Sequence, residues 1–244
     1  MLSYLIISGL LTVPGCDRDN DGFTKSEDCD DSNPDIGDGT HDGDLENDWT
    51  NFCTPACDRT IQGDLILNTA TSDDLESLSC IVEVQGHLKL NGNTSLTNLK
   101  GLEGLTHIGG DVEIVDSDSL LSLSGINHEL TINGSLYIIA NRNLSSISAL
   151  DGLSRVGFLY IEYNPFLENL DGLGTLSDIG GSLLIENNLY LNDISALYKV
   201  DHVGGYLTVF NNTELCESDV ERLIESIGEN NIDHAIGYNG LKDC

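Results

Sequence analysis

The sequence predicts a mostly β protein, a right-handed parallel β-solenoid of about seven turns of 23–24 residues, followed by a short C-terminal capping helix. Glycine recurs at that interval, at Gly63, Gly86, Gly110, Gly134, Gly157, Gly181 and Gly205. Apolar residues two and four positions after each glycine, such as Leu159 and Ile161, predict a short strand. Later in each turn apolar residues follow at intervals of three, as at Leu144 and Ile147. One such turn buries too little apolar surface to fold alone, so the turns must stack.

Asparagine stands seven positions after most of these glycines, at Asn93, Asn141, Asn164, Asn188 and Asn212. Its amide bonds readily to neighbouring backbone groups, and it tolerates left-handed conformations. We interpret this column as a structural ladder with no catalytic role. After the last turn, apolar residues at 220, 223, 224 and 227, with Gly228 as a stop signal, predict an amphipathic helix that covers the end of the solenoid.

The repeating unit (Gly, any, Leu, any, Ile, two any, Asn, two any, Leu) resembles the leucine-rich repeat, with wider spacing before the strand. It is most similar to the receptor L domain of insulin and epidermal growth factor receptor ectodomains, a module that also occurs in bacterial surface proteins. The segments from Cys80 to Leu90 and from Asn211 to Cys216 resemble the entry and the C-terminal cap of that family. The resemblance covers roughly residues 57–244 and implies a solenoid at the cell surface. It does not name a ligand, because a fold does not imply a function.

The N-terminal residues predict export. Residues 1–15 read as a signal peptide, because the apolar run from Leu2 to Val13 is too short for a span of about 20 residues. The sequence Val13-Pro14-Gly15-Cys16 resembles a bacterial lipobox, which implies a lipid on Cys16 and a protein anchored to the cell envelope. No basic residue precedes the apolar run, so ordinary signal cleavage and a misplaced start codon are the alternatives. We expect a stalk over residues 16–52, the solenoid over 53–215 and the cap over 216–244.

Six cysteines remain once Cys16 is set aside, and an even number outside the cytoplasm predicts disulfides. We expect Cys216 to pair with Cys244 in the cap, and Cys57, or alternatively Cys53, to pair with Cys80 in the first turn. A zinc site at Cys53 and Cys57 is the competing interpretation, although no second ligand pair lies near them in the sequence.

The segment from Asp17 to Asp48 contains thirteen acidic residues, with only Arg18 and Lys25 as basic partners. Within it, Asp17, Asp19, Asp21, the Phe23 carbonyl and Asp28 follow the spacing of a calcium loop, with Gly22 at the turn. An EF-hand has Glu where Asp28 stands, and its flanking helices are missing from the pattern. The run from Asp28 to Pro34 instead resembles acidic metal-binding repeats of secreted bacterial proteins, in the style of thrombospondin. We predict calcium binding here, with an unliganded acidic linker as the alternative.

Residues one, three and five positions after each glycine are predicted to face outward, because alternate strand residues face opposite sides. In the C-terminal half these positions hold Tyr137, Phe158, Tyr160, Tyr206 and Phe210. The sequence therefore predicts a recognition face for a protein or carbohydrate ligand, since exposed aromatic patches mark binding surfaces. Cross-strand aromatic packing that stiffens the sheet is the alternative.

The formal net charge of −31, from 10 basic and 41 acidic residues, argues against nucleic acid as a partner. It also argues against binding to anionic membranes, except through calcium or a lipid anchor. We predict a non-catalytic adhesion or recognition module. The competing class is a calcium-dependent polysaccharide lyase or glycosidase, for which Glu162 and Glu186, in one column of the repeat, are the nearest candidate pair.

Overall fold

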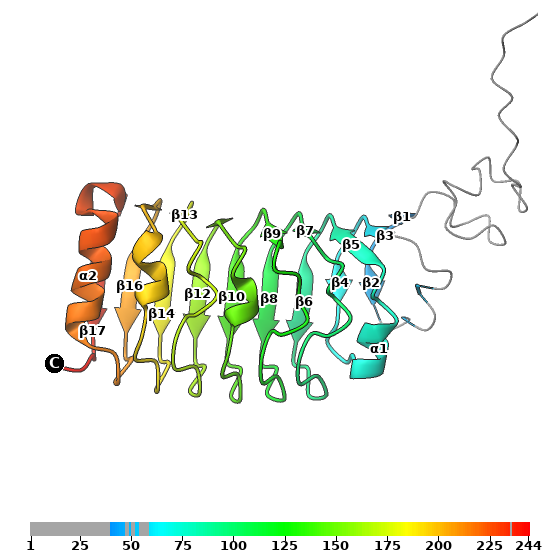
Figure 1. Ribbon diagram of the computed structural model, residues 1–244, viewed down its shortest axis with the longest axis horizontal. Helices are drawn as coiled ribbons and strands as arrows, with labels where there is room; N and C mark the ends of the chain where they lie inside the picture. The colour runs from blue at the N-terminus through cyan, green and yellow to red at the C-terminus, as the bar shows by residue number, and fades with distance from the viewer. Residues whose placement is uncertain (1–39, 47–48, 50–51, 54–58, 235) are drawn as a thin grey trace, which may run out of the picture.

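The repeated strands lie side by side in a long parallel sheet that runs the length of the molecule (Figure 1). A computed structural model describes residues 40–46, 49, 52–53, 59–234 and 236–244. The nine strands of this sheet are β2 (Leu45–Glu46), β4 (Leu65–Ile66), β6 (Leu88–Asn91), β8 (Val112–Val115), β10 (Leu136–Ile139), β12 (Leu159–Glu162), β14 (Leu183–Glu186), β16 (Leu207–Phe210) and β17 (Ile236–Asn239). All their pairings are parallel, which confirms the predicted stacked solenoid.

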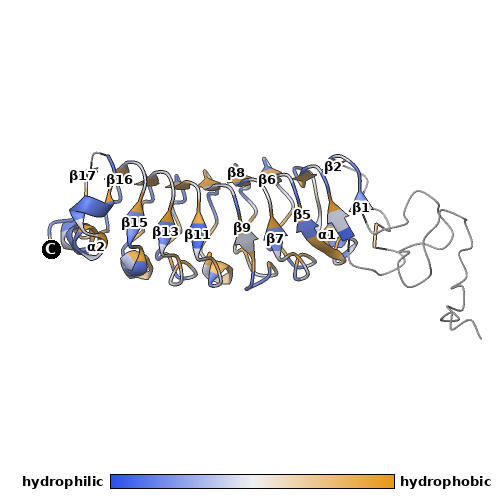
Figure 2. Ribbon diagram, turned by 90° about the horizontal axis from the view of Figure 1, so that it is seen from above, coloured by the Kyte–Doolittle hydropathy of each residue, from blue (hydrophilic) through white to orange (hydrophobic). Residues whose placement is uncertain are grey.

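Two smaller parallel sheets form the facing wall, which is visible when the molecule is seen from above (Figure 2). One contains β1 (Thr40–His41), β3 (Arg59–Ile61), β5 (Ile81–Val84), β7 (His107–Ile108) and β9 (Thr131–Ile132), and the other contains β11 (Arg155–Val156), β13 (Asp178–Ile179) and β15 (His202–Val203). The helical segments are α1 (Ser72–Glu76), η1 (Ser148–Leu150), η2 (Ser195–Lys199), α2 (Glu217–Ile227) and η3 (Glu229–Asn231). No helix in the described part of the chain has the length and apolar character needed to cross a bilayer.

A single apolar core fills the space between the walls. The strand residues two and four positions after each glycine are buried, as are the leucines and isoleucines spaced three apart. Each strand of the large sheet except β17 therefore buries one side and leaves the other half-buried or exposed, as in the alternating pattern of β12. This alternation holds the functional side chains of the sheet on its outer face.

Close backbone contact, not a left-handed conformation, explains the repeating glycine. The Gly134 N–H donates to the Gly110 carbonyl oxygen at 3.0 Å, and the Gly157 N–H donates to the Gly134 oxygen at 2.7 Å. A Cβ atom added at Gly134 would lie 2.5 Å from the carbonyl carbon of Gly110. Real Cβ atoms do not approach backbone that closely, so any other residue at Gly134 would push the turns apart.

The asparagine column forms a buried ladder, as expected. The Asn164 amide nitrogen donates to the Ile138 carbonyl at 2.8 Å, and its amide oxygen accepts from the Asn141 N–H at 3.1 Å. The same pattern continues to Asn188 and Asn212. The left-handed residue is the one before each member of this column, at Gly92, Asp116, Ala140, Tyr163, Asn187 and Asn211, with Ser117 in the place of asparagine after Asp116. The ladder thus satisfies the backbone groups at the bend that this conformation creates.

The large sheet extends one strand beyond the predicted turns at each end. Strand β2 pairs with β4, and Leu45 and Trp49 are buried in the core. Residues 40–46, which we had expected in the stalk, therefore belong to the solenoid. Strand β17 pairs with β16 at the other end.

The predicted capping helix is α2, which ends at Gly228 and buries Val220, Leu223 and Ile227. The Cys216–Cys244 disulfide joins the start of this helix to the C-terminus, as predicted. At the opposite end, Cys80 pairs with Cys53 and not with Cys57, which lies outside the described residues. The Cys53 N–H donates to the Ser77 carbonyl, and this bond holds Cys53 beside Cys80 with a Cα–Cα distance of 5.5 Å. Since Cys53 is bonded to Cys80, it is not available to zinc.

We predict that Asn164→Ala lowers the free energy of unfolding by about 3 kcal/mol, because two buried backbone groups lose their partners. Asn164→Ser should cost less, since Ser117 already occupies this column and donates to the Leu90 carbonyl. Urea unfolding followed by circular dichroism measures the difference. Asn143→Ala is the control, because the exposed Asn143 donates only to the Asp118 carbonyl and water can replace it. Equal losses for Asn164→Ala and Asn143→Ala would contradict the ladder.

Candidate functional site

The outer face of the nine-stranded sheet carries three columns of side chains. We call them the first, third and fifth columns, after their distance from the repeating glycine. The five aromatic residues predicted to face outward all lie in these columns, and none is buried. Phe158 and Tyr206 are the most exposed of the five, at 45% and 54%.

The register places these aromatic residues in one region without stacking them on one another. Tyr137 and Tyr160 are aligned on neighbouring strands, and Phe210 is aligned with Glu186. Phe158 and Tyr206 lie in the first column with Ser182 between them. Among the described residues the ring pairs are His41 with Phe52, Phe166 with Tyr190 and Tyr206 with His234, so no two of the five rings pack together. This arrangement does not support cross-strand stiffening as their role.

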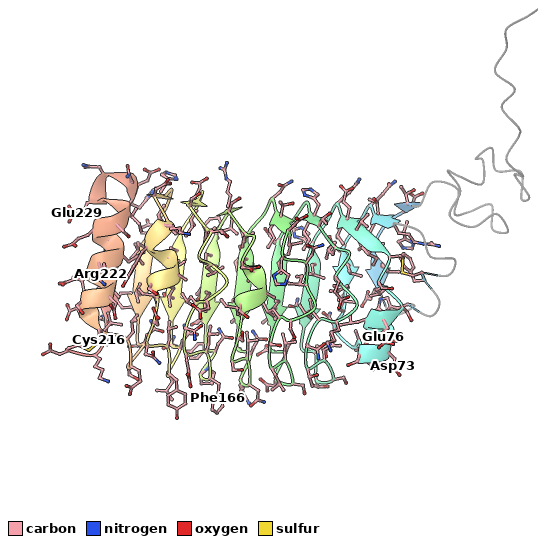
Figure 3. All side chains as sticks on the ribbon, viewed as in Figure 1. Asp73, Glu76, Phe166, Cys216, Arg222 and Glu229 are labelled. Atoms are coloured by element: carbon pink, nitrogen blue, oxygen red, sulfur yellow. A yellow bond between two sulfur atoms is a disulfide. The ribbon has the colours of Figure 1, made fainter. Side chains whose placement is uncertain are left out.

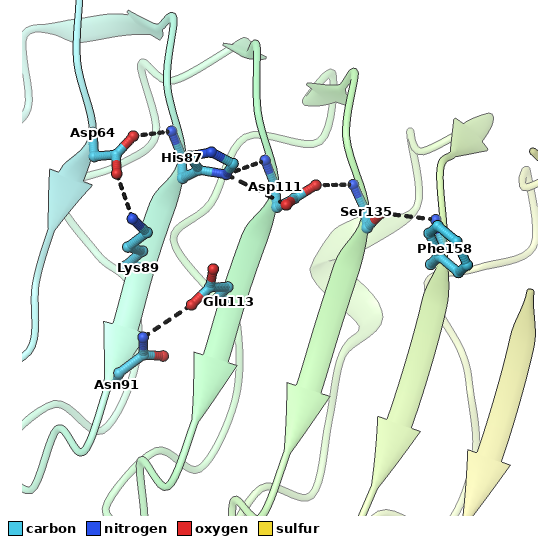
Figure 4. Close-up of polar contacts among 8 residues, drawn as sticks. All are labelled: Asp64, His87, Lys89, Asn91, Asp111, Glu113, Ser135 and Phe158. Atoms are coloured by element: carbon cyan, nitrogen blue, oxygen red, sulfur yellow. Dashed lines mark hydrogen bonds and ion pairs between the residues drawn. The ribbon is translucent and has the colours of Figure 1, made fainter. Parts of the chain in front are cut away.

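In the N-terminal half, the polar side chains of this face are paired with each other (Figure 4). Lys89 donates to and forms an ion pair with Asp64, and the Asn91 amide donates to Glu113 at 3.0 Å. Burial alone would raise the pKa of the Asp64 carboxyl, but the bonds from Lys89 and the His87 N–H together hold it below its ordinary value. The same Lys89–Asp64 bond raises the pKa of the Lys89 ammonium. In this half, Asp64 therefore has a basic partner in Lys89, and Glu113 accepts a hydrogen bond from a neutral amide.

The C-terminal half of the face has acids without basic partners. The Tyr160 hydroxyl donates to Glu162 at 2.6 Å, and the Asn187 amide donates to the same carboxylate at 3.3 Å. Burial and the bond to Glu162 raise the pKa of the Tyr160 hydroxyl. Within the described residues the Glu186 carboxylate accepts no hydrogen bond, and it lies on the strand next to Glu162. Burial, and then the charge of Glu162, raise the pKa of Glu186.

The three columns contain no lysine or arginine from Ser135 to Phe210. Five aromatic rings and two carboxylates therefore share a surface on which the protein supplies no basic side chain. Exposed rings with uncompensated carboxylates are suited to hold a cationic group, by cation–π attraction and by charge. Sequence reasoning had placed Glu162 and Glu186 in one column but had not predicted that Glu186 lacks a partner.

A second group of exposed apolar residues lies at the turns that follow the strands, and sequence reasoning missed it. It comprises Leu121, Tyr163, Phe166, Leu189 and Tyr190. The Phe166 and Tyr190 rings lie 5.8 Å apart, and Figure 3 shows Phe166 pointing away from the body of the molecule. The sequence could have revealed this pair, because Phe166 and Tyr190 both stand nine positions after the repeating glycine of their turns.

The predicted calcium ligands Asp17, Asp19, Asp21, Phe23 and Asp28 and the predicted lipidation site Cys16 all lie outside the described residues. Within the described part, no group of three or more His, Cys, Asp or Glu side chains is arranged to hold a metal ion. The calcium and lipid assignments therefore stay predictions from sequence.

The fold and this face together define a parallel β-solenoid with an unpartnered outer sheet surface. Residues 56–171 match the family model of the Receptor L domain, which is a ligand-binding and typically non-enzymatic module. No curated protein and no solved structure matches the chain. The disulfides and the similarity to the Receptor L domain indicate an extracellular or secreted protein. The family match includes Phe158 and Tyr160 and ends before Glu186, Tyr206 and Phe210.

We predict that Glu186→Gln slightly stabilises the protein at pH 7, by at most about 0.5 kcal/mol after solvent screening. A carboxyl whose pKa is raised by folding destabilises the folded state when it is ionised, so the cost exists above that raised pKa. It disappears below the ordinary value of 4.5, where the group is protonated in both states. Thermal unfolding of both proteins at pH 7 and pH 4 tests this. A stabilisation of equal size at both pH values would show that charge is not its cause.

Proposed function

We propose that this protein binds a basic protein ligand on the C-terminal half of the outer face of its nine-stranded sheet. The observation that carries the proposal is the combination of five outward aromatic residues with the carboxylates of Glu162 and Glu186, without a lysine or arginine among them. The similarity to a ligand-binding family supports a binding role and does not identify the ligand.

Charge favours a basic partner over a neutral or acidic one. The chain has a net charge of −31, so it attracts positive groups and repels negative ones over the whole surface. A cation placed at Glu186 would offset both the burial of that carboxylate and its repulsion by Glu162. A carbohydrate ligand would stack on the rings without using these charges.

To test this, partners are first captured by crosslinking on intact cells, and affinities are then measured with purified protein. The double variant Glu162→Gln with Glu186→Gln should weaken binding by about tenfold, mainly by losing charge attraction. Affinity should also fall as salt is raised, because exposed charges are screened.

Glu113→Gln is the matched control for this comparison. Glu113 lies in the third column of the same sheet, and a glutamine there can still accept the Asn91 bond. We expect this variant to bind within about twofold of wild type. If Glu113→Gln weakens binding as much as the double variant, the face is not specific and only overall charge matters.

We further propose that residues 17–28 bind calcium and that a lipid on Cys16 attaches the protein to the cell envelope. The support is the spacing of Asp17, Asp19, Asp21, Phe23 and Asp28 and the lipobox-like sequence before Cys16. The acidic segment would then be a calcium-stiffened stalk that presents the solenoid to its ligand.

Calorimetric titration of the full chain with calcium should give a dissociation constant of about 10⁻⁴–10⁻³ M, typical of extracellular modules. Asp19→Asn with Asp21→Asn should abolish that binding, because it removes two converging ligands. Asp42→Asn with Asp73→Asn removes the same charge from two exposed positions outside the loop and should leave calcium binding intact. Equal loss in both variants would mean that calcium is only attracted by the general negative charge.

A further inference from the structure

The first column of the outer face has a structural task in most turns. Its side chain accepts a hydrogen bond from the backbone N–H of the first-column residue in the next turn (Figure 4). These bonds run from Asp64 N–H to Asp44, His87 N–H to Asp64, Asp111 N–H to His87, Ser135 N–H to Asp111, Phe158 N–H to Ser135 and Tyr206 N–H to Ser182. Most turns therefore place at this position a side chain with an acceptor atom close to its own backbone.

Phe158 and Tyr206 depart from this pattern. Phe158 has no acceptor atom, so the turn that follows it receives no such bond. Both rings project from the sheet and stay about half exposed, and Ser182 between them keeps the usual bond to the Tyr206 N–H. Stability of the sheet does not explain why these two turns carry aromatic residues.

The two rings flank an open slot with a floor of glycine. Its volume is about 460 Å³, and its lining includes Phe158, Gly181, Ser182, Gly205, Tyr206 and His234. A Cβ atom at Gly181 would lie 2.9 Å from two carbons of the Phe158 ring, so the ring rests directly over that glycine. On the other side, the Tyr206 and His234 rings lie 5.0 Å apart. The absence of a side chain at Gly181 makes room for the Phe158 ring, and Phe158 and Tyr206 stay 45% and 54% exposed.

The charges around the slot favour a cation. Two carboxylates, Asp178 and Asp233, lie around the slot against one guanidinium. That guanidinium, of Arg155, lies beside the slot-lining Gly180 and is held by Asp178 at 2.9 Å, while Asp233 lies 3.8 Å from His202. Aromatic faces attract cations, and the planar guanidinium of arginine stacks on such faces better than the compact ammonium of lysine. We propose that this slot holds an arginine side chain presented by the protein ligand. The inference rests on the proposed function and names the group that the ligand would insert.

The test is a titration of the full chain with N-acetyl-arginine amide, observed by NMR of ¹³C-labelled phenylalanine and tyrosine rings. We expect saturable shifts at Phe158 and Tyr206. N-acetyl-citrulline amide, which has the same shape without the charge, should bind about tenfold more weakly. Binding of citrulline amide or of a neutral methyl pyranoside as strong as that of the arginine probe would overturn the proposal in favour of a neutral ligand.

Phe158→Ser is the informative variant, because serine is the residue that Ser135 and Ser182 already place in this column. It should fold and lose the arginine probe. Gly181→Ala should also weaken binding, since the new methyl group displaces the Phe158 ring. Tyr190→Ser removes an exposed ring outside the slot and should bind like wild type. Wild-type binding by Phe158→Ser would refute the site.

The small probe reports on the slot alone, whereas the Glu162 and Glu186 comparison uses the captured partner. If the Glu162→Gln, Glu186→Gln double variant binds the captured partner as tightly as wild type, while the arginine probe still shifts Phe158 and Tyr206, the proposed function is contradicted and the slot is not. If the double variant binds the partner more weakly but the arginine probe gives no saturable shift, the slot is contradicted and the proposed function is not.

Discussion

The contact on which the rest of the structure depends is the stacking of backbone on backbone at the glycine column. At most of these positions the glycine of the turn before lies within 3 Å of where a Cβ atom would stand, so no side chain fits between them. This contact sets the register of every strand, and the register sets the columns. The buried asparagines then satisfy the bend at the far end of each strand. Binding residues on the outer face are placed by a framework that they do not help to build.

Much of this framework was predictable, because it depends on residue types that recur. The seven internal turns, the inward pairs such as Leu159 and Ile161, the asparagine ladder and helix α2 follow from periodicity alone. The two end strands were not predictable: β17 has Tyr238 where the neighbouring strand has the buried Val209, and Gly43 lies only 20 residues before Gly63. Cys80 pairs with Cys53 and not with Cys57 because the Cys53 N–H bonds to the Ser77 carbonyl, and the spacing of the cysteines in the sequence does not reveal this contact. The outward aromatics were found from alternation, but the slot was not, because it depends on the Phe158 ring lying across Gly181 in the next turn.

The two halves of the outer face divide their tasks. In the N-terminal half, Lys89 pairs with Asp64 and the Asn91 amide nitrogen donates to Glu113, while the buried Asn91 amide oxygen has no partner among the described residues. In the C-terminal half, the Glu186 carboxylate accepts no hydrogen bond among the described residues, and Phe158 stands where most turns have a side chain that accepts from the next turn. Such local departures from what the fold prefers are typical of functional surfaces, where stability is exchanged for binding. The repeat makes these departures visible, because the remaining turns show which residue types usually stand at the same positions.

The first-column bonds have one direction, since each side chain accepts only from the turn that follows. A whole turn added between Gly110 and Gly134 would therefore meet suitable partners on both sides and disturb none of the existing ones. It would move Phe158 and Tyr206 away from the N-terminal end by one strand spacing, about 4.8 Å, and leave their relative positions unchanged. The length of the solenoid can therefore change during evolution by whole turns, while the C-terminal half of the outer face stays the same.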